Sequence, residues 1–349
     1  MSVQPASVVD RSAARLGTRR RLVQKLTTNP STLPTLASLV IFVGMLAYGE
    51  SAYGRIVQYS TLSNLFINNA HIIILAAGLT MVILTGGIDL SVGAVVALTS
   101  VAGVMSVNAG LDPWLAVGLM VLIGSAFGLF SGILIQYFNV QPFIATLSSM
   151  FLARGLAAIL STDAEQLDPD ASIRVLAETI TIVDGPKVND LETTAGVIIA
   201  LLVVAGVFFL LHRTRLGRTA YAIGGSEQSA LLMGLPVNRT KLWLYTLSGT
   251  LAGLASVVYT TRIGVGQNII GEGWEMQAIA AAVIGGTLLT GGAGFVLGSV
   301  VGALVLGLMN VLITRDGTIP PAWTTIITGG VLLVFVLIQR AVTAVRRRT

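Results

Sequence analysis

The chain has 349 residues, of which 54% are hydrophobic and only 11% are charged, and its mean hydropathy is +0.84. Because so few charged side chains cannot cover the surface of a soluble domain, the composition excludes a soluble protein and predicts a polytopic protein in a lipid bilayer. The absence of cysteine excludes disulfides and cysteine metal sites. The net charge of +5 comes from basic loops and tails, which indicates membrane orientation and no nucleic-acid partner.

About 20 apolar residues cross a bilayer as a helix. By this measure the sequence predicts an all-α fold of about ten transmembrane helices. We expect residues 33–342 to form the transmembrane domain. Residues 1–32, which lack a signal-peptide cleavage site, and residues 343–349 are expected to be basic cytoplasmic tails. The expected spans are residues 35–53, 65–85, 89–107, 113–138, 142–161, 194–211, 241–262, 275–290, 294–313 and 323–341.

The apolar run from Gly78 to Ser100 is interrupted by Gly86 and Gly87 and by a single carboxylate, Asp89. An ionisable residue in a membrane-length segment marks a position critical for the fold or for a solute pathway. The two glycines break the preceding helix, and Asp is among the best residues for capping the next one, with Ser91 supporting a polar turn. We expect Asp89 to be this cap near the cytoplasmic side, and a pathway role is the alternative.

The same frame recurs further along the chain, where residues 288–298 repeat the pattern of residues 83–93. Gly291 and Gly292 stand where the first copy has its Gly-Gly pair, and Gly294 stands where it has the carboxylate. An internal repeat that keeps its glycines predicts a shared backbone bend in two broken helices, as in many transporter folds. The residues of the predicted breaks or pathway are Gly86, Gly87, Asp89, Ser91, Gly291 and Gly292.

Glycines also recur every four residues from Gly124 to Gly132 and from Gly294 to Gly302, a pattern typical of closely packed membrane helices. The segment 162–193 is rich in Asp and Glu, whereas the segment 212–241 is basic. Because Lys and Arg favour cytoplasmic loops, the count of ten spans predicts that 162–193 is an external acidic loop and 212–241 a cytoplasmic one.

The loop 212–241 is long for a connector and carries helix signals of its own. Ser226 can cap a helix, Glu227 is favourable in its first turn, and Gly234 followed by Pro236 ends it. A short helix between two spans suggests a docking element for a soluble partner. The alternative is a solvated connector whose charge reflects only membrane orientation.

Motifs for catalysis are missing from the sequence. No Gly-Lys pair occurs, so the chain has no phosphate-binding loop of the GxxxxGK[ST] type. There is no HExxH or GxSxG motif, and an aspartyl protease would need a second membrane carboxylate beside Asp89. The two histidines, His71 and His212, do not form a local metal motif. We therefore expect no catalytic residues, no metal site and no enzyme activity.

Three motifs carry a resemblance to a known family: TGGIDLSVG at 85–93, the loop at 213–235, and AIAAAVIGGTLLTGGAGFVLGSVVGAL at 278–304. They resemble the permease subunits of monosaccharide ABC importers, the ribose, xylose and galactofuranose group. The resemblance extends from about Ser60 to Arg340. Through residues 141–157 and 317–329 the chain is most similar to galactofuranose-type permeases.

The resemblance implies a permease in the cell (inner or plasma) membrane, with both termini cytoplasmic. It would pair with a second permease copy or paralogue, ATP-binding subunits and an extracytoplasmic sugar-binding protein. ATP would bind to the partners, and this chain would bind no cofactor. The loop 212–241 would couple to the ATPase, with Glu227 and Ala230 on the facing surface. The expected coupling residues are Arg213, Arg218, Ala222, Gly224, Ser226, Glu227, Ala230 and Gly234.

An ion-coupled secondary transporter of a small polar solute is the alternative function. Such a transporter needs ionisable groups within the membrane, and here the supply is limited to Asp89 and Arg154. Which sugar is carried, and whether the two permeases are identical, cannot be deduced from the sequence.

Overall fold

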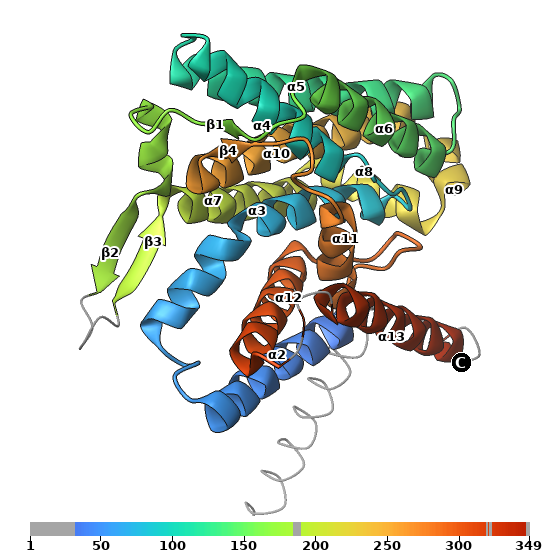
Figure 1. The fold of residues 1–349 in the computed structure, drawn as a ribbon. Helices are drawn as coiled ribbons and strands as arrows, with labels where there is room; N and C mark the ends of the chain where they lie inside the picture. The colour runs from blue at the N-terminus through green and yellow to red at the C-terminus, as the bar shows by residue number, and fades with distance from the viewer. Residues whose placement is uncertain (1–31, 184–189, 319, 321–322, 347–349) are drawn as a thin grey trace, which may run out of the picture.

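The computed structural model describes residues 32–183, 190–318, 320 and 323–346. Within these residues each of the ten expected spans corresponds to one apolar helix, so the all-α polytopic membrane fold is confirmed (Figure 1). Seven of them are long and apolar enough to cross a membrane, whereas α4, α11 and the apolar part of α13 are shorter. The helices are α2 (Thr32–Tyr53), α3 (Tyr59–Leu84), α4 (Val92–Asn108), α5 (Pro113–Gln136), α6 (Pro142–Leu160), α7 (Ala195–Arg213), α10 (Val237–Ile263), α11 (Trp274–Ile284), α12 (Val296–Asp316) and α13 (Trp323–Arg346).

The two expected tails fall mostly outside the described residues. Of the tail 1–32 only Thr32 is described, and it begins α2. Of the tail 343–349, residues 343–346 belong to α13, so this helix continues beyond the predicted end of the transmembrane domain at residue 342.

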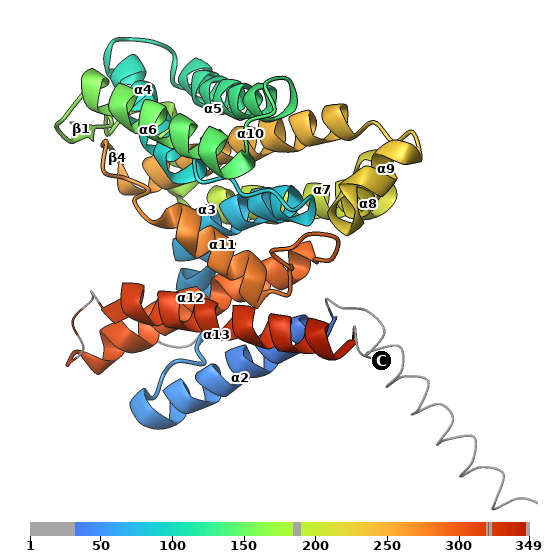
Figure 2. The same ribbon diagram turned by 90° about the vertical axis from the view of Figure 1, so that its right-hand side faces the viewer.

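Helix α3 is the centre of the bundle, and nearly all of its residues from Leu65 to Leu84 are buried. It packs against α7, α10, α11 and α12. In both ribbon views it lies between a group formed by α4, α5, α6 and α10 and a group formed by α2, α12 and α13 (Figures 1 and 2). A helix that is apolar all round can be stable only in such a buried position or in lipid.

The closest helix pair is α5 with α10, and the expected glycine ridge makes this contact. A Cβ atom at Gly124 would overlap the backbone of Gly249, and one at Gly128 would overlap the carbonyl oxygen of Tyr245. Small residues let two backbones approach in lipid, where apolar burial supplies little driving force between helices. The second ridge begins later than predicted, because Gly294 precedes α12, while Gly298 and Gly302 of that helix pack against α11.

Helix α11 corrects the expected span 275–290, because it ends at Ile284. Its 11 residues cover about 16 Å, roughly half of the hydrocarbon layer. The segment 264–273, which precedes it, has no helical structure and runs along α4: Gly266 packs beside Ser100, and Gly271 packs beside Gly93. Non-helical backbone at membrane depth is tolerated only where protein covers it, as α4 does here.

Side chains from other helices satisfy the free carbonyl groups of this broken crossing. The guanidinium of Arg154 on α6 donates to the carbonyl oxygens of Asn268, at 2.5 Å, and Ile270, at 2.8 Å. At the other end of α11, Thr35 donates to Gly285 O at 2.7 Å and Gln339 donates to Val283 O at 2.9 Å. Lipid cannot supply such partners, so the break is held in place by side chains of three other helices, α2, α6 and α13.

The short elements lie at opposite ends of the bundle. The pair β1 (Glu165–Gln166) and β4 (Val265–Gly266) and the hairpin β2 (Thr179–Val183) and β3 (Leu191–Thr194) lie at one end, both antiparallel. A 3₁₀ turn, η1 (Ser172–Ala177), lies between β1 and β2. The helices α8 (Arg215–Gly225) and α9 (Glu227–Leu232) lie at the other end, toward which α2 begins and α13 ends (Figure 2). The segments 162–193 and 212–241 are thus on opposite sides.

We predict that Gly128→Ala destabilises the protein, because the new methyl group would push α5 away from Tyr245 of α10. Overpacking of this kind costs about 1–3 kcal/mol. Gly118→Ala on the same helix is the matched control, since nothing lies within 4 Å of its Cβ position. Thermal unfolding in detergent, followed by size-exclusion chromatography, should show a lower midpoint for the first variant only. Equal midpoints would contradict the close contact.

Candidate functional site

Helices α8 and α9 form a compact unit between α7 and α10, and caps define its ends. Thr214 begins α8, with its hydroxyl oxygen accepting from Gly217 N–H at 3.3 Å. Ser226 is the N-cap of α9, as expected, and accepts from Ser229 N–H at 3.2 Å. Such caps replace the partners that the first turn of a helix lacks.

Gly234 ends α9 in the left-handed conformation, with φ of +73°. The N–H of Gly234 donates to Leu231 O and that of Leu235 donates to Ala230 O, the bonding pattern of a Schellman motif. The predicted termination at Gly234 is therefore confirmed. Its consequence is a chain reversal that leads directly into α10.

Ala230 does not lie on the surface, which makes the expected partner-facing position of this residue wrong. Its side chain is fully buried against Ile223 of α8 and Val237 of α10. Because α9 has a single inward face, its apolar exposed residues lie on the opposite side. These are Leu231, Leu232 and Met233, of which Leu232 is 84% exposed.

The rest of the predicted loop residues surround this unit. Arg213, Arg218, Ser226 and Glu227 are exposed, and Ala222 is half-buried against the Ala230 cluster. Glu227 forms an ion pair with Lys241 of α10 at 2.5 Å, which ties α9 to the next span. A pocket of about 410 Å³ lies between α8 and the end of the loop, lined by Arg215, Arg218, Thr219, Leu235 and Pro236.

Gly224 joins α8 to the helix breaks. A Cβ atom at this position would overlap the carbonyl oxygen of Leu84, the last residue of α3, and the N–H of Gly292. Gly292 N–H itself donates to Leu84 O at 2.9 Å. The end of α3, the loop before α12 and the end of α8 therefore meet at one point, which we call the glycine junction (Leu84, Gly86, Gly224, Gly291 and Gly292).

Tyr221, one turn before Gly224, makes a second contact with the same loop. Its hydroxyl donates to the carbonyl oxygen of Gly294 at 2.9 Å. Burial raises the pKa of the Tyr221 hydroxyl, so it stays protonated as the donor at physiological pH. Helix α8 is thus attached to the loop 285–295 through both a hydrogen bond and close backbone packing.

Helix α3 ends in a Schellman motif at Gly86, which has φ of +77°. Gly86 N–H donates to Ile83 O, and Gly87 N–H donates to Val82 O. A Cβ atom at Gly87 would overlap the hydroxyl of Tyr245 on α10, so this second glycine is needed for close approach rather than for its backbone angles.

Asp89 is fully buried and serves as a cross-link between the break and α10. It accepts from Ser91 N–H at 3.0 Å, from the Ser91 hydroxyl at 2.6 Å and from the Ser248 hydroxyl at 2.8 Å. The expectation that Asp89 is the N-cap of α4 is wrong, because Ser91 occupies that position and the helix begins at Val92. Asp89 instead satisfies the turn that precedes the cap.

The internal repeat is less regular than its sequence suggests. The glycine of the second copy that ends a helix as Gly86 does is Gly286, with φ of +100° and the same pair of backbone bonds. Gly291 and Gly292 lie further along, in a longer loop, and pack against the first copy at the glycine junction. The two Gly-Gly pairs therefore do not form equivalent bends, which corrects the predicted shared bend.

Sequence reasoning missed the apolar tip Leu231–Met233 and the contacts of Tyr221 and Ser248. The signal for the tip was present, since three consecutive apolar residues before a terminating glycine cannot all face inward on a short helix. The contacts of Tyr221 and Ser248 carry no local signal, because their partners are far away in sequence.

The apolar helices of the described residues are those of a multi-pass membrane protein. Residues 61–336 match the family described as the permease component of branched-chain amino acid transport systems. The match covers most of the chain, and the chain belongs to this family.

Individual relatives are similar over most of their length. The chain is 54% identical to the fructose import permease protein FruG of Bifidobacterium longum, covering 90% of this chain and 92% of the relative. It is 38% identical to the inner membrane ABC transporter permease protein YjfF of Escherichia coli, covering 89% and 93%. It is 36% identical to the ribose import permease protein RbsC of Bacillus subtilis, covering 76% and 80%. The resemblance to permeases of monosaccharide ABC importers is confirmed.

We predict that Gly224→Ala loosens the α8–α9 unit, because the methyl group cannot fit between Leu84 O and Gly292 N–H. The neighbouring change Gly225→Ala is the control, since nothing lies within 4 Å of that Cβ position. Limited proteolysis should cut the loop 212–241 faster in the first variant than in the second. Identical cleavage rates would show that the junction is not tightly packed.

A second prediction concerns Asp89. Asp89→Leu removes the acceptor for Ser91 and Ser248, and each buried donor left unpaired costs about 1–3 kcal/mol. Asp89→Asn keeps one oxygen for Ser91 and should leave most of the protein folded. The measurement is the yield of monodisperse protein in size-exclusion chromatography. A stable Asp89→Leu variant that failed only in solute transport would assign Asp89 to the pathway.

Proposed function

We propose that this chain is the permease subunit of an ABC importer, which carries a monosaccharide delivered by an extracytoplasmic binding protein and is driven by separate ATP-binding subunits. The observation that carries this proposal is an exposed apolar tip beside a basic pocket on a capped unit that touches the helix breaks. The relatives named above, import permeases for fructose and ribose, support the class of solute.

The surface of the α8–α9 unit is suited to a soluble protein partner. An exposed apolar tip of Leu231, Leu232 and Met233 favours a protein contact, because moving apolar side chains out of water is favourable. Arg215 and Arg218 beside it attract acidic side chains and orient the partner. We assign this surface to the ATP-binding subunit, with ATP held by that partner and no cofactor on this chain.

The contacts of α8 suggest how motion of the partner reaches the membrane. A push on α8 is transmitted through Gly224 and Tyr221 to the end of α3 and to the loop before α12. Closely packed backbones transmit a displacement without side-chain relaxation. ATP binding would then favour one arrangement of the spans because the closed ATPase contacts α8 differently in the two states.

The carried sugar and the second permease are further parts of the proposal. The relatives are named for fructose, ribose and D-allose, and the expected galactofuranose-type subgroup stays a prediction. A second copy or a paralogue would complete a pathway between two permeases. The inner or plasma membrane is the expected location.

The alternative of an ion-coupled transporter is less well supported than the ABC importer, because Asp89 and Arg154, its two candidate coupling groups, both have structural partners. Asp89 is enclosed by the hydroxyls of Ser91 and Ser248, and the guanidinium of Arg154 is occupied by two carbonyl oxygens. Both groups therefore have structural partners that explain their presence in the membrane. An importer with separate ATPases needs no coupling ion.

The function is tested by co-expressing the chain with the ATP-binding and sugar-binding proteins encoded beside it. The complex should import a monosaccharide into proteoliposomes only when ATP is supplied on the ATPase side. Import driven by an ion gradient without ATP would instead establish the secondary transporter.

Within this complex we predict that Leu232→Asp abolishes co-purification of the ATPase, because it places a charge on the proposed contact while leaving the buried side of α9 unchanged. The control is Val57→Asp, which introduces the same charge at an exposed apolar position near the opposite end. Both variants should insert in normal amounts. Retention of the ATPase by Leu232→Asp would exclude the tip as the docking site.

Orientation is predicted from the charge distribution and from the placement of the two loops at opposite ends. Both termini and the loop 212–241 are expected in the cytoplasm, with the loop 162–193 outside. Because the chain lacks cysteine, single cysteines can be introduced as Ser172→Cys and Ser226→Cys. An impermeant thiol reagent applied to intact cells should label only the first. Labelling of both from outside would refute this topology.

A further inference from the structure

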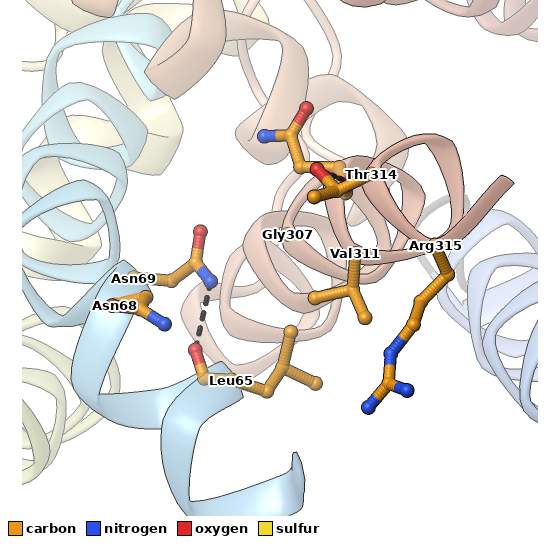
Figure 3. Close-up of a pocket in the computed structure, with 8 residues that line it drawn as sticks. Leu65, Asn68, Asn69, Gly307, Val311, Thr314 and Arg315 are labelled. Carbon is orange, nitrogen blue, oxygen red and sulfur yellow. Dashed lines mark hydrogen bonds between the residues drawn. The ribbon is translucent and has the colours of Figure 1, made fainter. Parts of the chain in front are cut away.

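A pocket with a mixed polar and apolar lining lies between α3 and α12, at the end of the bundle away from α8 and α9 (Figure 3). Its volume is about 390 Å³, within the range of about 300–1,000 Å³ typical of small-molecule sites. Polar side chains from both helices converge on it: Asn68, Asn69, Asn310, Thr314 and Arg315. None of the residues of the glycine junction lines this pocket, so the polar side chains of the pocket need a separate explanation.

Two amide side chains of this pocket are unusual for their position. Both α3 and α12 are long and apolar enough to span a membrane, yet Asn68 and Asn310 are exposed on them. Amide groups facing lipid are costly because hydrocarbon offers no hydrogen-bond partner. Polar residues in spans therefore usually face a water-filled cavity or a solute pathway.

The lining groups are held in fixed orientations. Gly307 makes room for Asn69, because a Cβ atom at that position would overlap the Asn69 amide. The Asn69 amide N–H donates to Leu65 O at 2.7 Å, which leaves its carbonyl oxygen as an acceptor. The guanidinium of Arg262 donates to the carbonyl oxygen of Asn68, which leaves the Asn68 NH₂ group as a donor.

Helix α12 adds hydrogen-bond donors and acceptors that face those of α3. The Thr314 hydroxyl donates to Asn310 O at 2.8 Å, so its oxygen remains an acceptor toward the pocket. The Asn310 amide offers both a donor and an acceptor. Alternating donors and acceptors on two facing helices suit sugar hydroxyls, because each hydroxyl both donates and accepts.

We propose that this pocket is a transit site for a neutral monosaccharide on its way from the binding protein to the pathway, an inference that rests on the proposed function. The lining residues include no carboxylate and a single cation, Arg315, so the site selects neither a cation nor a multiply charged anion. Its lining residues include no aromatic ring on which a sugar could stack, so we expect the sugar to bind weakly. A conduction site must release its solute as readily as it binds it.

The first test measures ATP-driven sugar uptake by the reconstituted complex carrying Asn310→Leu together with Thr314→Val. Uptake should fall by at least about tenfold, as expected for the loss of two hydrogen bonds to the sugar. Co-purification of the ATPase should be unchanged. The control is Ser51→Ala, which removes an exposed hydroxyl that bonds to its own helix, as Thr314 does, but on α2. Uptake within twofold of the unmodified complex would overturn the inference.

The second test uses the cysteine-free background. In an Asn310→Cys variant, a charged methanethiosulfonate reagent should react with the thiol, and millimolar transported sugar should slow this reaction. Leu202→Cys, at an exposed apolar position on α7, is the control that should not react. Three results would overturn the inference. No reaction at position 310 would assign the pocket to lipid, and reaction without protection by sugar would assign it to water. A spontaneous disulfide between two permease copies would assign it to a subunit contact.

Failure of the proposed function and failure of the transit site give different results. If the unmodified complex imports no sugar, the proposed function fails and the transit site with it. If the unmodified complex imports sugar and both variants behave like it, only the transit site is wrong.

Discussion

A backbone N–H or C=O group at membrane depth must find a partner within the protein, and the arrangement of this molecule follows from how its broken helices meet that requirement. Three non-helical segments, 85–91, 264–273 and 285–295, lie among the spans. Each is fixed by at least one polar side chain from elsewhere in the chain. Asp89 organises the first with hydroxyls of Ser91 and Ser248, and Arg154 binds carbonyl oxygens of the second.

The third segment is held in the same way, and this connects it to the loop at the end of the bundle. Tyr221 donates to Gly294 O, and Gly292 N–H donates to Leu84 O. Because these contacts also satisfy the break, a displacement of α8 would disturb the end of α3 and the loop before α12. The same bonds that stabilise irregular backbone in the membrane thus provide a physical connection from the outer surface of α8 to the spans.

Glycines and polar side chains have different roles in this structure. Glycines are used where backbones must touch, as between α5 and α10 and at the glycine junction. Charged side chains are used where backbone groups would otherwise be unpaired: Arg154 donates to two carbonyl oxygens, and Asp89 accepts from the N–H of Ser91. This division explains why a chain with so few charged residues keeps Asp89 and Arg154 in its membrane domain.

The sequence by itself determined the class, the number of apolar helices and the two ends of α9, because hydropathy, charge bias and capping act within a few residues of one another. Ser226 caps the start of α9 and Gly234 ends it, as local rules require. Its motifs also identified the permease family. The early end of α11 was missed, although the pair Gly285 and Gly286 directly after Ile284 was a local signal for it.

Only the tertiary structure decided which residues face which partners. Ala230 is buried because α8 and α10 converge on it, and Asp89 is bound to Ser248 because α10 passes beside the break. The repeat glycines have different roles because the second loop is longer and folds back onto the first copy. Such contacts join residues distant in sequence, so their energies depend on how whole helices pack, which no local pattern encodes.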